Sequence, residues 1–332
     1  MSEVRVLVRG AGVAGLVTAV MLAESGAAVT LAEQGPRIGS GASWKAGGML
    51  APWCEAETAP HEILEHATET IAWWLAHAPD AMRHGSLVLA PQRDVGELAR
   101  FARRTTAHEW LDRDGIAALE PDLAGRFSKA LFFPQEAHLD PRLALPALAR
   151  LLGELGGRIL LGVDQVAGPF DWTIDCRGFA AREALAGLPN LPGLRGVRGE
   201  MLLLRCPELT LARPVRLLHP RFPLYLVPRA DHVFMVGATM VESEQQGGIT
   251  ARALMELLGA AYAVHPAFAD AELLETGAGL RPSFPDNMPR VVEAGNVISV
   301  NGMHRHGFLL APVQATAVAA RLGLRPGAGL HT

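Results

Sequence analysis

The order of apolar and glycine positions at the start of the chain predicts a strand, a tight turn and a helix. Residues 4–8 are mostly apolar and β-branched, and the apolar stretch 16–24 follows a glycine-rich turn. Gly26 ends that helix, and residues 28–32 form a second apolar segment that Glu33 closes. This order predicts a βαβ unit with parallel strands, as in an α/β protein.

Hydrophobic periodicity predicts the remaining elements. Helices are expected over residues 61–78, 95–119, 142–154 and 312–322. Strands are expected at residues 87–89, 131–133, 159–161, 172–174, 201–204, 225–227, 233–236 and 297–300. Residues 40–53 are too rich in glycine and alanine for a strand or a surface helix, and such a segment suits close approach of the backbone to a ligand.

Composition narrows the class of protein. A chain of 332 residues with 49% hydrophobic residues can bury a sizeable core, and its net charge of −4 gives no broad basic field for nucleic acid or anionic membranes. The apolar run at residues 11–23 is interrupted by glycines and too short to span a bilayer. Three cysteines stand far apart without a CxxC pair, and no signal peptide is visible, so we expect a cytoplasmic protein without a membrane anchor, disulfide framework or structural zinc.

The glycines of the first turn carry a dinucleotide-binding fingerprint. Gly10, Gly12 and Gly15 stand where a chain turns tightly, approaches a pyrophosphate and packs a helix on a strand. Glu33 lies near the spacing expected of an acid that binds a ribose, and an acid there argues against NADP. FAD and NAD share this fingerprint, which therefore leaves both cofactors open.

Further motifs run the length of the chain. They are residues 41–52 (GASWKAGGMLAP), 133–134 with 138–141 (FP, HLDP), 225–229 with 236–239 (YLVPR, VGAT), 279–282 with 285–286 (GLRP, PD), and 301–312 (NGMHRHGFLLAP). Together they resemble the D-amino-acid oxidase and glycine oxidase family of FAD-dependent oxidoreductases, most closely the glycine oxidases of thiamine biosynthesis. The resemblance implies FAD as the cofactor.

The same resemblance implies a Rossmann-like FAD-binding domain that is discontinuous in sequence, with an inserted β-rich substrate domain. Residues 1–80, 140–195 and 265–332 are assigned to the FAD-binding domain, and residues 81–139 and 196–264 to the substrate domain. Backbone and small side chains from two segments are expected to contact the flavin. These are Ala42, Ser43, Gly47, Gly48 and Met49, and Gly302, His304, Arg305, His306, Gly307, Phe308 and Leu309.

Two residues match the family's substrate-binding positions. Arg281 corresponds to the arginine that clamps the substrate carboxylate, a role that suits a guanidinium fork, and Tyr225 to a pocket tyrosine. Arg305 is expected near the pyrimidine edge of the flavin, where positive charge stabilises the reduced ring. The alternative interpretations are a surface Arg281 held by Asp286, a core tyrosine and a solvated Arg305.

The remaining polar residues in or next to these motifs are expected to have no catalytic or metal-binding role. His304 and His306 have no carboxylate or cysteine at ligand spacing, so no metal site is expected. Lys45 could attract superoxide but is expected at the loop surface, and Cys54 is expected to be an inert buried thiol instead of a covalent flavin link.

The implied reaction is oxidative deamination of glycine or another small amino acid or amine, with hydride passing from Cα to flavin N5. The products would be an imine and, after reoxidation by molecular oxygen, hydrogen peroxide, with a role in forming the thiazole of thiamine. A flavin dehydrogenase with another acceptor, a non-catalytic redox sensor and an oxidase of a tRNA base are the alternatives, and self-association stays open. The chain departs from the family pattern at two places. Gly277 stands where many relatives carry tryptophan, and residues 290–292 replace a usual Ile-Gly. These departures leave the size of the substrate open.

Overall fold

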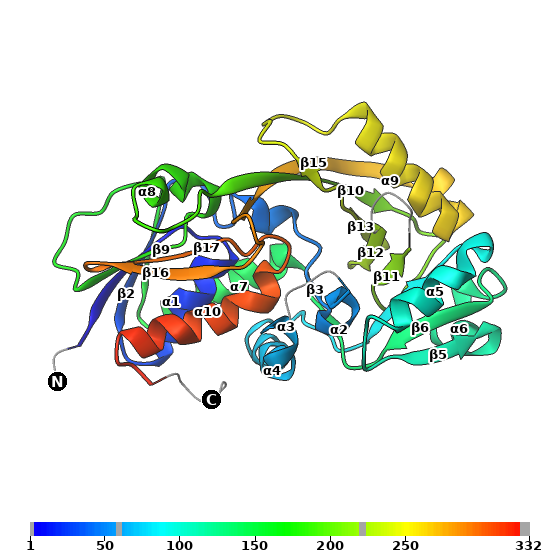
Figure 1. Ribbon diagram of the computed structural model, residues 1–332, viewed down its shortest axis with the longest axis horizontal. Helices are drawn as coiled ribbons and strands as arrows, with labels where there is room; N and C mark the ends of the chain where they lie inside the picture. The colour runs from blue at the N-terminus through cyan, green and yellow to red at the C-terminus, as the bar shows by residue number, and fades with distance from the viewer. Residues whose placement is uncertain (1–2, 58–61, 219–223, 326–332) are drawn as a thin grey trace.

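The N-terminal apolar segment forms an interior strand of a six-stranded sheet in the computed structural model, which describes residues 3–57, 62–218 and 224–325. The strand order is β16-β17-β9-β1-β2-β8, and all neighbours are parallel except the antiparallel pair β16–β17. The strands are β1 (Arg5–Arg9), β2 (Ala28–Glu33), β8 (Arg158–Leu161), β9 (Trp172–Asp175), β16 (Arg290–Ala294) and β17 (Val297–Asn301). This parallel pairing confirms the predicted α/β fold (Figure 1).

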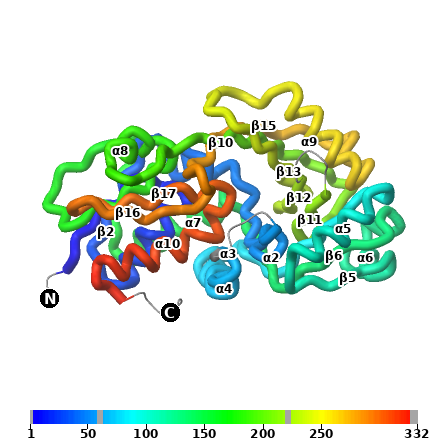
Figure 2. Tube along the Cα trace, in the orientation of Figure 1, coloured from blue at the N-terminus to red at the C-terminus, as the bar shows by residue number. Residues whose placement is uncertain are grey.

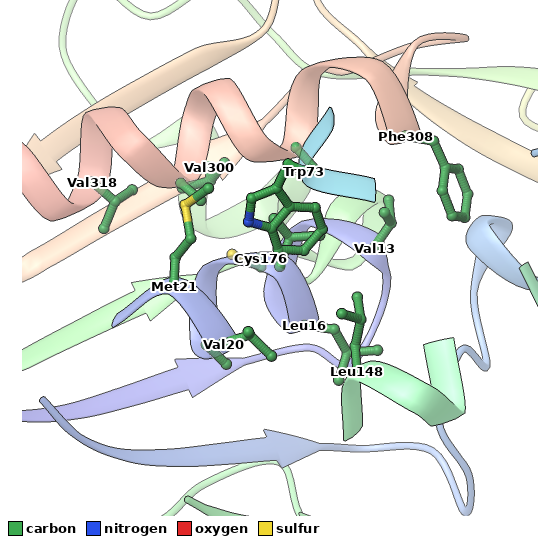
Figure 3. Close-up of a cluster of buried hydrophobic side chains, with 14 of the residues drawn as sticks. Val13, Leu16, Val20, Met21, Trp73, Leu148, Cys176, Val300, Phe308 and Val318 are labelled. Carbon is green, nitrogen blue, oxygen red and sulfur yellow. The ribbon is translucent and has the colours of Figure 1, made fainter. Parts of the chain in front are cut away.

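Helix α1 (Val13–Glu24) is apolar on nearly all sides because protein surrounds it. It packs against α7 (Pro141–Glu154) and α10 (Gly307–Arg321), and most of its residues are buried. Figure 3 shows Leu16 and Val318 in the resulting core. The other helical elements of this lobe are η1 (Ala42–Lys45), α2 (Pro52–Glu55), α3 (Glu62–Glu65), α4 (Ala67–His77), η4 (Gly178–Ala181) and α8 (Arg182–Ala186). The core thus fixes the first turn of α1 against the C-terminal helix.

Helix α10 begins earlier than predicted and contains a proline. Pro312 has no N–H to donate to the carbonyl oxygen of Phe308, one turn before it. The indole Nε1 of Trp74 donates to that oxygen at 2.6 Å, and the hydroxyl of Thr70 donates to the carbonyl oxygen of Leu309 at 3.1 Å. Two side chains of α4 therefore support the backbone at the start of α10, the stretch expected to contact the flavin.

A second, nine-stranded sheet forms the other lobe, with the order β14-β10-β13-β12-β11-β4-β6-β5 and with β15 paired to β10. Its strands are β4 (Ser86–Leu89), β5 (Glu109–Asp112), β6 (Lys129–Phe133), β10 (Arg195–Arg205), β11 (Val215–Leu217), β12 (Leu224–Pro228), β13 (Val233–Gly237), β14 (Val241–Glu242) and β15 (Glu272–Ser283). Its helical elements are η2 (Gln92–Asp94), α5 (Val95–Ala102), α6 (Arg113–Leu119), η3 (Pro121–Leu123), α9 (Ala251–Val264) and η5 (Pro266–Ala269).

The chain passes between the two lobes several times, as the tube in Figure 2 shows. The longest strands, β10 and β15, pair antiparallel and extend from one lobe to the other. Strand β15 falls in the range predicted for the FAD-binding domain, yet it hydrogen-bonds to the nine-stranded sheet. The division into two domains stays a prediction.

One predicted helix is wrong. In place of a continuous helix over residues 95–119, the chain forms α5, then strand β5, then α6. Residues 109–112 pair with β6, and that pairing places Trp110 beside Leu131. The carboxylate of Asp112 accepts a hydrogen bond from the backbone N–H of Gly115 at 2.9 Å and so begins a new helix.

The glycine-rich segment and the helix that follows it are also divided. Residues 42–55 hold η1, the two-residue strand β3 (Met49–Leu50), which pairs with β7 (Ala137–His138), and α2. The helix expected over residues 61–78 is present as α3 and α4, and its first predicted residue lies outside the described residues. Within the described chain, no helix combines the length and apolar character needed to cross a bilayer.

Candidate active site

The turn between β1 and α1 requires glycine at two of its three fingerprint positions. Gly10 has a φ of +98°, and a Cβ there would lie 2.7 Å from the carbonyl oxygen of Cys176. A Cβ on Gly15 would lie 1.8 Å from the carbonyl oxygen of Gly10, so this residue closes the turn against the helix. The backbone N–H of Val13 donates to the hydroxyl of Ser43 at 3.0 Å. The turn and the glycine-rich segment are thus joined at the start of α1.

Glu33 fixes this turn from the end of β2. One oxygen of its buried carboxylate accepts the N–H of Ala11 at 2.7 Å, and the other accepts the N–H of Gly35 at 2.8 Å. Each carboxylate oxygen can accept a second hydrogen bond, so these contacts leave acceptor capacity for a ribose hydroxyl. The ribose contact of Glu33 stays a prediction. The sequence analysis missed the two hydrogen bonds by which Glu33 holds the turn.

A cavity of about 620 Å³ opens beside this turn and extends between the two lobes. Its walls come from the β1–α1 turn, the glycine-rich segment, β10, β12, β15 and the stretch 300–309. Of the predicted site residues, only Gly15 does not line it, because Gly15 packs inside the turn. A volume of this size suits a cofactor or small ligand. The N-cap residue Gly12 has no side chain to cap the first turn of α1, and such a helix N-terminus suits a pyrophosphate. The residues present therefore fit a dinucleotide.

The glycine-rich segment is held in its shape by the other lobe. Gly48 has a φ of +75°, and a Cβ there would lie 2.2 Å from the carbonyl oxygen of Leu139. The guanidinium of Arg229, on the loop after β12, donates to the carbonyl oxygen of Gly47 at 2.7 Å and also to that of Leu139. The sequence placed Arg229 in a family motif without a role. In the structure, this buried arginine fixes the wall on which Gly47 lies.

Arg281 and Tyr225 meet at the substrate end of the cavity. The guanidinium of Arg281 lies over Gly199, where a Cβ would be 2.3 Å from it, and donates to the carbonyl oxygen of Thr239 at 3.1 Å. The ring of Tyr225 packs on Gly47, and burial raises the pKa of its hydroxyl although Arg281 acts in the opposite direction. The tyrosine is therefore a neutral hydrogen-bond donor at neutral pH.

Arg281 differs from the other arginines that line the cavity. Arginines 9, 177, 198 and 305 each have an acidic partner within 3.1 Å. Among the described residues, Arg281 forms no ion pair. The alternative interpretation, in which Asp286 holds it at the surface, is wrong because Asp286 pairs with Arg290 at 2.7 Å. A partly buried guanidinium in a cavity, without a carboxylate partner, is prepared to bind one from a ligand.

Arg305 is paired with a residue that the sequence analysis missed. Its guanidinium donates to Glu55 at 2.8 Å, and Glu55 also accepts from Arg216 at 3.2 Å. Burial opposes ionisation of Glu55, yet the two arginines lower the pKa of its carboxyl to about 2. No local pattern marks Glu55, because its partners lie far away in sequence. The solvated interpretation of Arg305 is wrong, since its side chain is only 15% exposed.

The two histidines beside Arg305 are neutral at neutral pH. Burial, with the nearby Arg281, lowers the pKa of His304 to about 3, and burial lowers that of His306 to about 4. Both line the cavity. In the described parts of the chain, no group of three or more His, Cys, Asp or Glu residues could hold a metal ion.

Lys45 is partly buried and Cys54 is fully buried. Lys45 lines the cavity, packs its stem against Gly277 and Gly279, and donates to the carbonyl oxygen of Ala278, so the expected place at the loop surface is wrong. Burial lowers the pKa of this ammonium. Cys54 is fully buried, and burial raises the pKa of its thiol well above the usual range, which makes it a poor nucleophile.

Comparisons with known proteins identify relatives of the chain over nearly its full length. The sequence profile of the FAD dependent oxidoreductase family matches residues 5–321. The chain is 57% identical over 320 residues, 96% of each chain, to a Rhizobium etli protein provisionally named thiamine biosynthesis oxidoreductase ThiO. It is 30% identical to the glycine oxidase of Pseudomonas aeruginosa over 96% of this chain and 94% of that one.

Among solved structures, the fold is similar to that of glycine oxidase from Geobacillus kaustophilus. The two share a TM-score of 0.81 and 24% identity over 96% of this chain and 94% of the other. Because the family profile covers nearly the whole chain, this protein belongs to the family of FAD-dependent oxidoreductases.

Proposed function

We propose that the protein oxidises glycine, or another small amino acid or amine, to an imine with FAD as the cofactor and molecular oxygen as the electron acceptor. The product would serve the thiazole of thiamine. The observation that carries the proposal is the partly buried guanidinium of Arg281, which forms no ion pair within the described chain and lies in the cavity that also contains the dinucleotide turn. A cation at this place selects a carboxylate, and most small amines lack one.

The chain's own residues would bind and orient the substrate. Arg281 would hold the carboxylate in a bidentate contact, and the neutral hydroxyl of Tyr225 would donate to it. FAD, when bound, supplies the two-electron acceptor and passes the electrons to oxygen. Gly10, Gly12 and Glu33 would hold its dinucleotide part, and residues 42–49 and 302–309 would lie along its ring. No side-chain base is required, because the protein has mainly to position the amine and exclude water.

The names of the relatives support this choice of substrate. ThiO of Rhizobium etli and the glycine oxidase of Pseudomonas aeruginosa match this chain over nearly its full length. We further propose a cytoplasmic location, which the three buried free thiols support. Self-association stays a prediction.

An anaerobic absorbance titration of the purified holoenzyme with glycine tests the proposal. Glycine should bleach the flavin band near roughly 450 nm, and readmitted oxygen should restore the band with release of hydrogen peroxide. Sarcosine and small D-amino acids serve as further reductants. A yellow protein that none of these compounds bleaches would contradict the proposal. Bleaching without reoxidation by oxygen would favour a dehydrogenase instead.

A further inference from the structure

The ion pair between Glu55 and Arg305 lies inside the cavity, at the same end as Arg281. Both side chains line the cavity and are only 11% and 15% exposed, and the atoms that pair are 2.8 Å apart. Glu55 is the last residue of α2, whereas Arg305 precedes α10. The two meet only because the fold brings the glycine-rich segment against the C-terminal stretch.

A second arginine fixes Glu55 from behind. Arg216 of β11 donates to one oxygen of Glu55 at 3.2 Å and to the backbone oxygen of Cys54 at 3.1 Å, with a side chain that is only 3% exposed. Glu57 lies 3.6 Å from the same guanidinium. Because Arg216 holds α2 at two points, the carboxylate of Glu55 stays directed at Arg305.

Arginines already engage the anions of this cluster. Glu55 pairs with Arg216 and Arg305, and Glu57 pairs with Arg104 at 3.3 Å and lies 3.6 Å from Arg216. The lowered pKa values of His304 and His306 leave both rings neutral at neutral pH. The ammonium of Lys45 donates to the carbonyl oxygen of Ala278, and the negative charge of Glu275 stabilises it. Among the described arginines that line the cavity, Arg281 is the one without an anionic partner.

Building on the proposed function, we infer that Glu55 determines specificity by occupying Arg305, so that the pocket accepts substrates with one carboxylate and rejects those with two. A second carboxylate would have to displace Glu55 from Arg305 or lie beside the anionic Glu55. Neither arrangement is favourable in a buried site, where like charges repel strongly and an unpaired charge is costly. Glycine and alanine satisfy this rule, and aspartate and other amino dicarboxylates do not.

The test compares binding of acetate and malonate to the FAD-loaded enzyme, read from the change that each ligand causes in the flavin spectrum. Neither acid is an amine, so the readout does not depend on turnover. We expect acetate to bind the unaltered enzyme more tightly than malonate. In Glu55→Gln, Arg305 is free to pair with the second carboxylate, and the affinity for malonate relative to acetate should rise about tenfold or more.

The matched control is Glu57→Gln. It removes the same charge beside Arg216 but leaves the contact with Arg305 intact, so the malonate-to-acetate ratio should stay close to that of the unaltered enzyme. An unchanged ratio in Glu55→Gln, or an equal rise in Glu57→Gln, would overturn the inference.

Two further variants keep the test decisive if Glu55→Gln loses FAD. Arg305→Gln leaves Glu55 without its partner in the cavity, and acetate should bind about tenfold more weakly. The double variant Glu55→Gln with Arg305→Gln removes both charges and should keep the original preference for acetate. Unaltered acetate binding in the first, or new malonate binding in the second, contradicts the inference. Failure of glycine to reduce the flavin would refute the proposed function alone, because it does not affect this ratio.

Discussion

The two ends of the cavity are held together by different kinds of contact. At the dinucleotide end, backbone groups carry the structure: Gly15 packs on the carbonyl of Gly10, and Glu33 binds the N–H groups of Ala11 and Gly35. All of these residues lie in one short stretch of the chain. That end is therefore specified by local sequence, and a change there should affect folding and cofactor binding together.

At the substrate end, charged side chains from distant segments carry the structure. Glu55, Arg216 and Arg305 come from α2, β11 and the turn before α10, and Arg281 comes from β15. Such contacts form only once the whole chain has folded. Loss of any one of them should leave the fold intact. The comparison predicts that this end can be altered in binding and specificity while the cofactor site stays intact.

The largest effect is expected from Gly15→Ala. The new Cβ would lie 1.8 Å from the carbonyl oxygen of Gly10, so the turn must move, at a cost of about 3–5 kcal/mol in unfolding free energy and with loss of FAD. Urea unfolding and the retained flavin absorbance measure both quantities. The control is Gly153→Ala in α7, which meets nothing within 4 Å and should be neutral or stabilising by about 0.5–1 kcal/mol. Equal behaviour of the two variants would refute the role assigned to the turn.

Arg281→Met should impair the substrate end of the cavity and leave the dinucleotide end intact. It removes the guanidinium that would bind the carboxylate, and kcat/KM for glycine should fall about a hundred- to thousandfold while FAD stays bound. Steady-state kinetics and the flavin spectrum measure these two properties. Arg100→Met, at a side chain that is 67% exposed, should change neither property. A variant that loses FAD together with activity would contradict the proposed separation.

The same contrast explains what could be predicted from the sequence. The strand, turn and helix around Gly10 and Gly15 were predictable because periodicity and glycine spacing act over neighbouring residues. Arg281 and Tyr225 could be named only through resemblance to a family, since an arginine on a strand has no local mark of function. Glu55 and Arg229 were missed because their partners lie far along the chain. Strand β5 was missed because its pairing with β6 outweighs its helical pattern.

Glu33→Gln gives a smaller effect, at the dinucleotide end. An amide has one oxygen, so it can accept the N–H of Ala11 or that of Gly35 but leaves the other facing an NH₂ group. The expected loss is about 2–3 kcal/mol in unfolding free energy, with weaker FAD binding. Thermal unfolding and FAD dissociation constants provide the measurement. The exposed Glu154→Gln is the matched control, and a Glu33 variant as stable as this control would show that the two backbone bonds do not hold the turn.

Behind the substrate end of the cavity lies the carboxylate of Glu136, whose environment is the opposite of that of Glu55. Glu136 is completely buried behind α2, where one oxygen accepts the N–H of Cys54 at 2.7 Å and the other has no hydrogen-bond partner among the described residues. Burial raises its pKa to about 8 from an ordinary 4.5, whereas the arginines hold that of Glu55 near 2. One carboxyl thus keeps its proton at neutral pH while its neighbour is ionised.

The smallest predicted effect follows from the proton on Glu136. Below pH 4.5 the folded and unfolded chains both bind this proton; between pH 4.5 and about 8 only the folded chain keeps it, so its contribution to stability is lost as the pH rises. Glu136→Gln cannot titrate and should gain about 1–2 kcal/mol over the unaltered protein between roughly pH 5 and pH 6.5. Urea unfolding at both pH values measures this difference. Parallel pH profiles for the two proteins would show that Glu136 is ionised in the folded state.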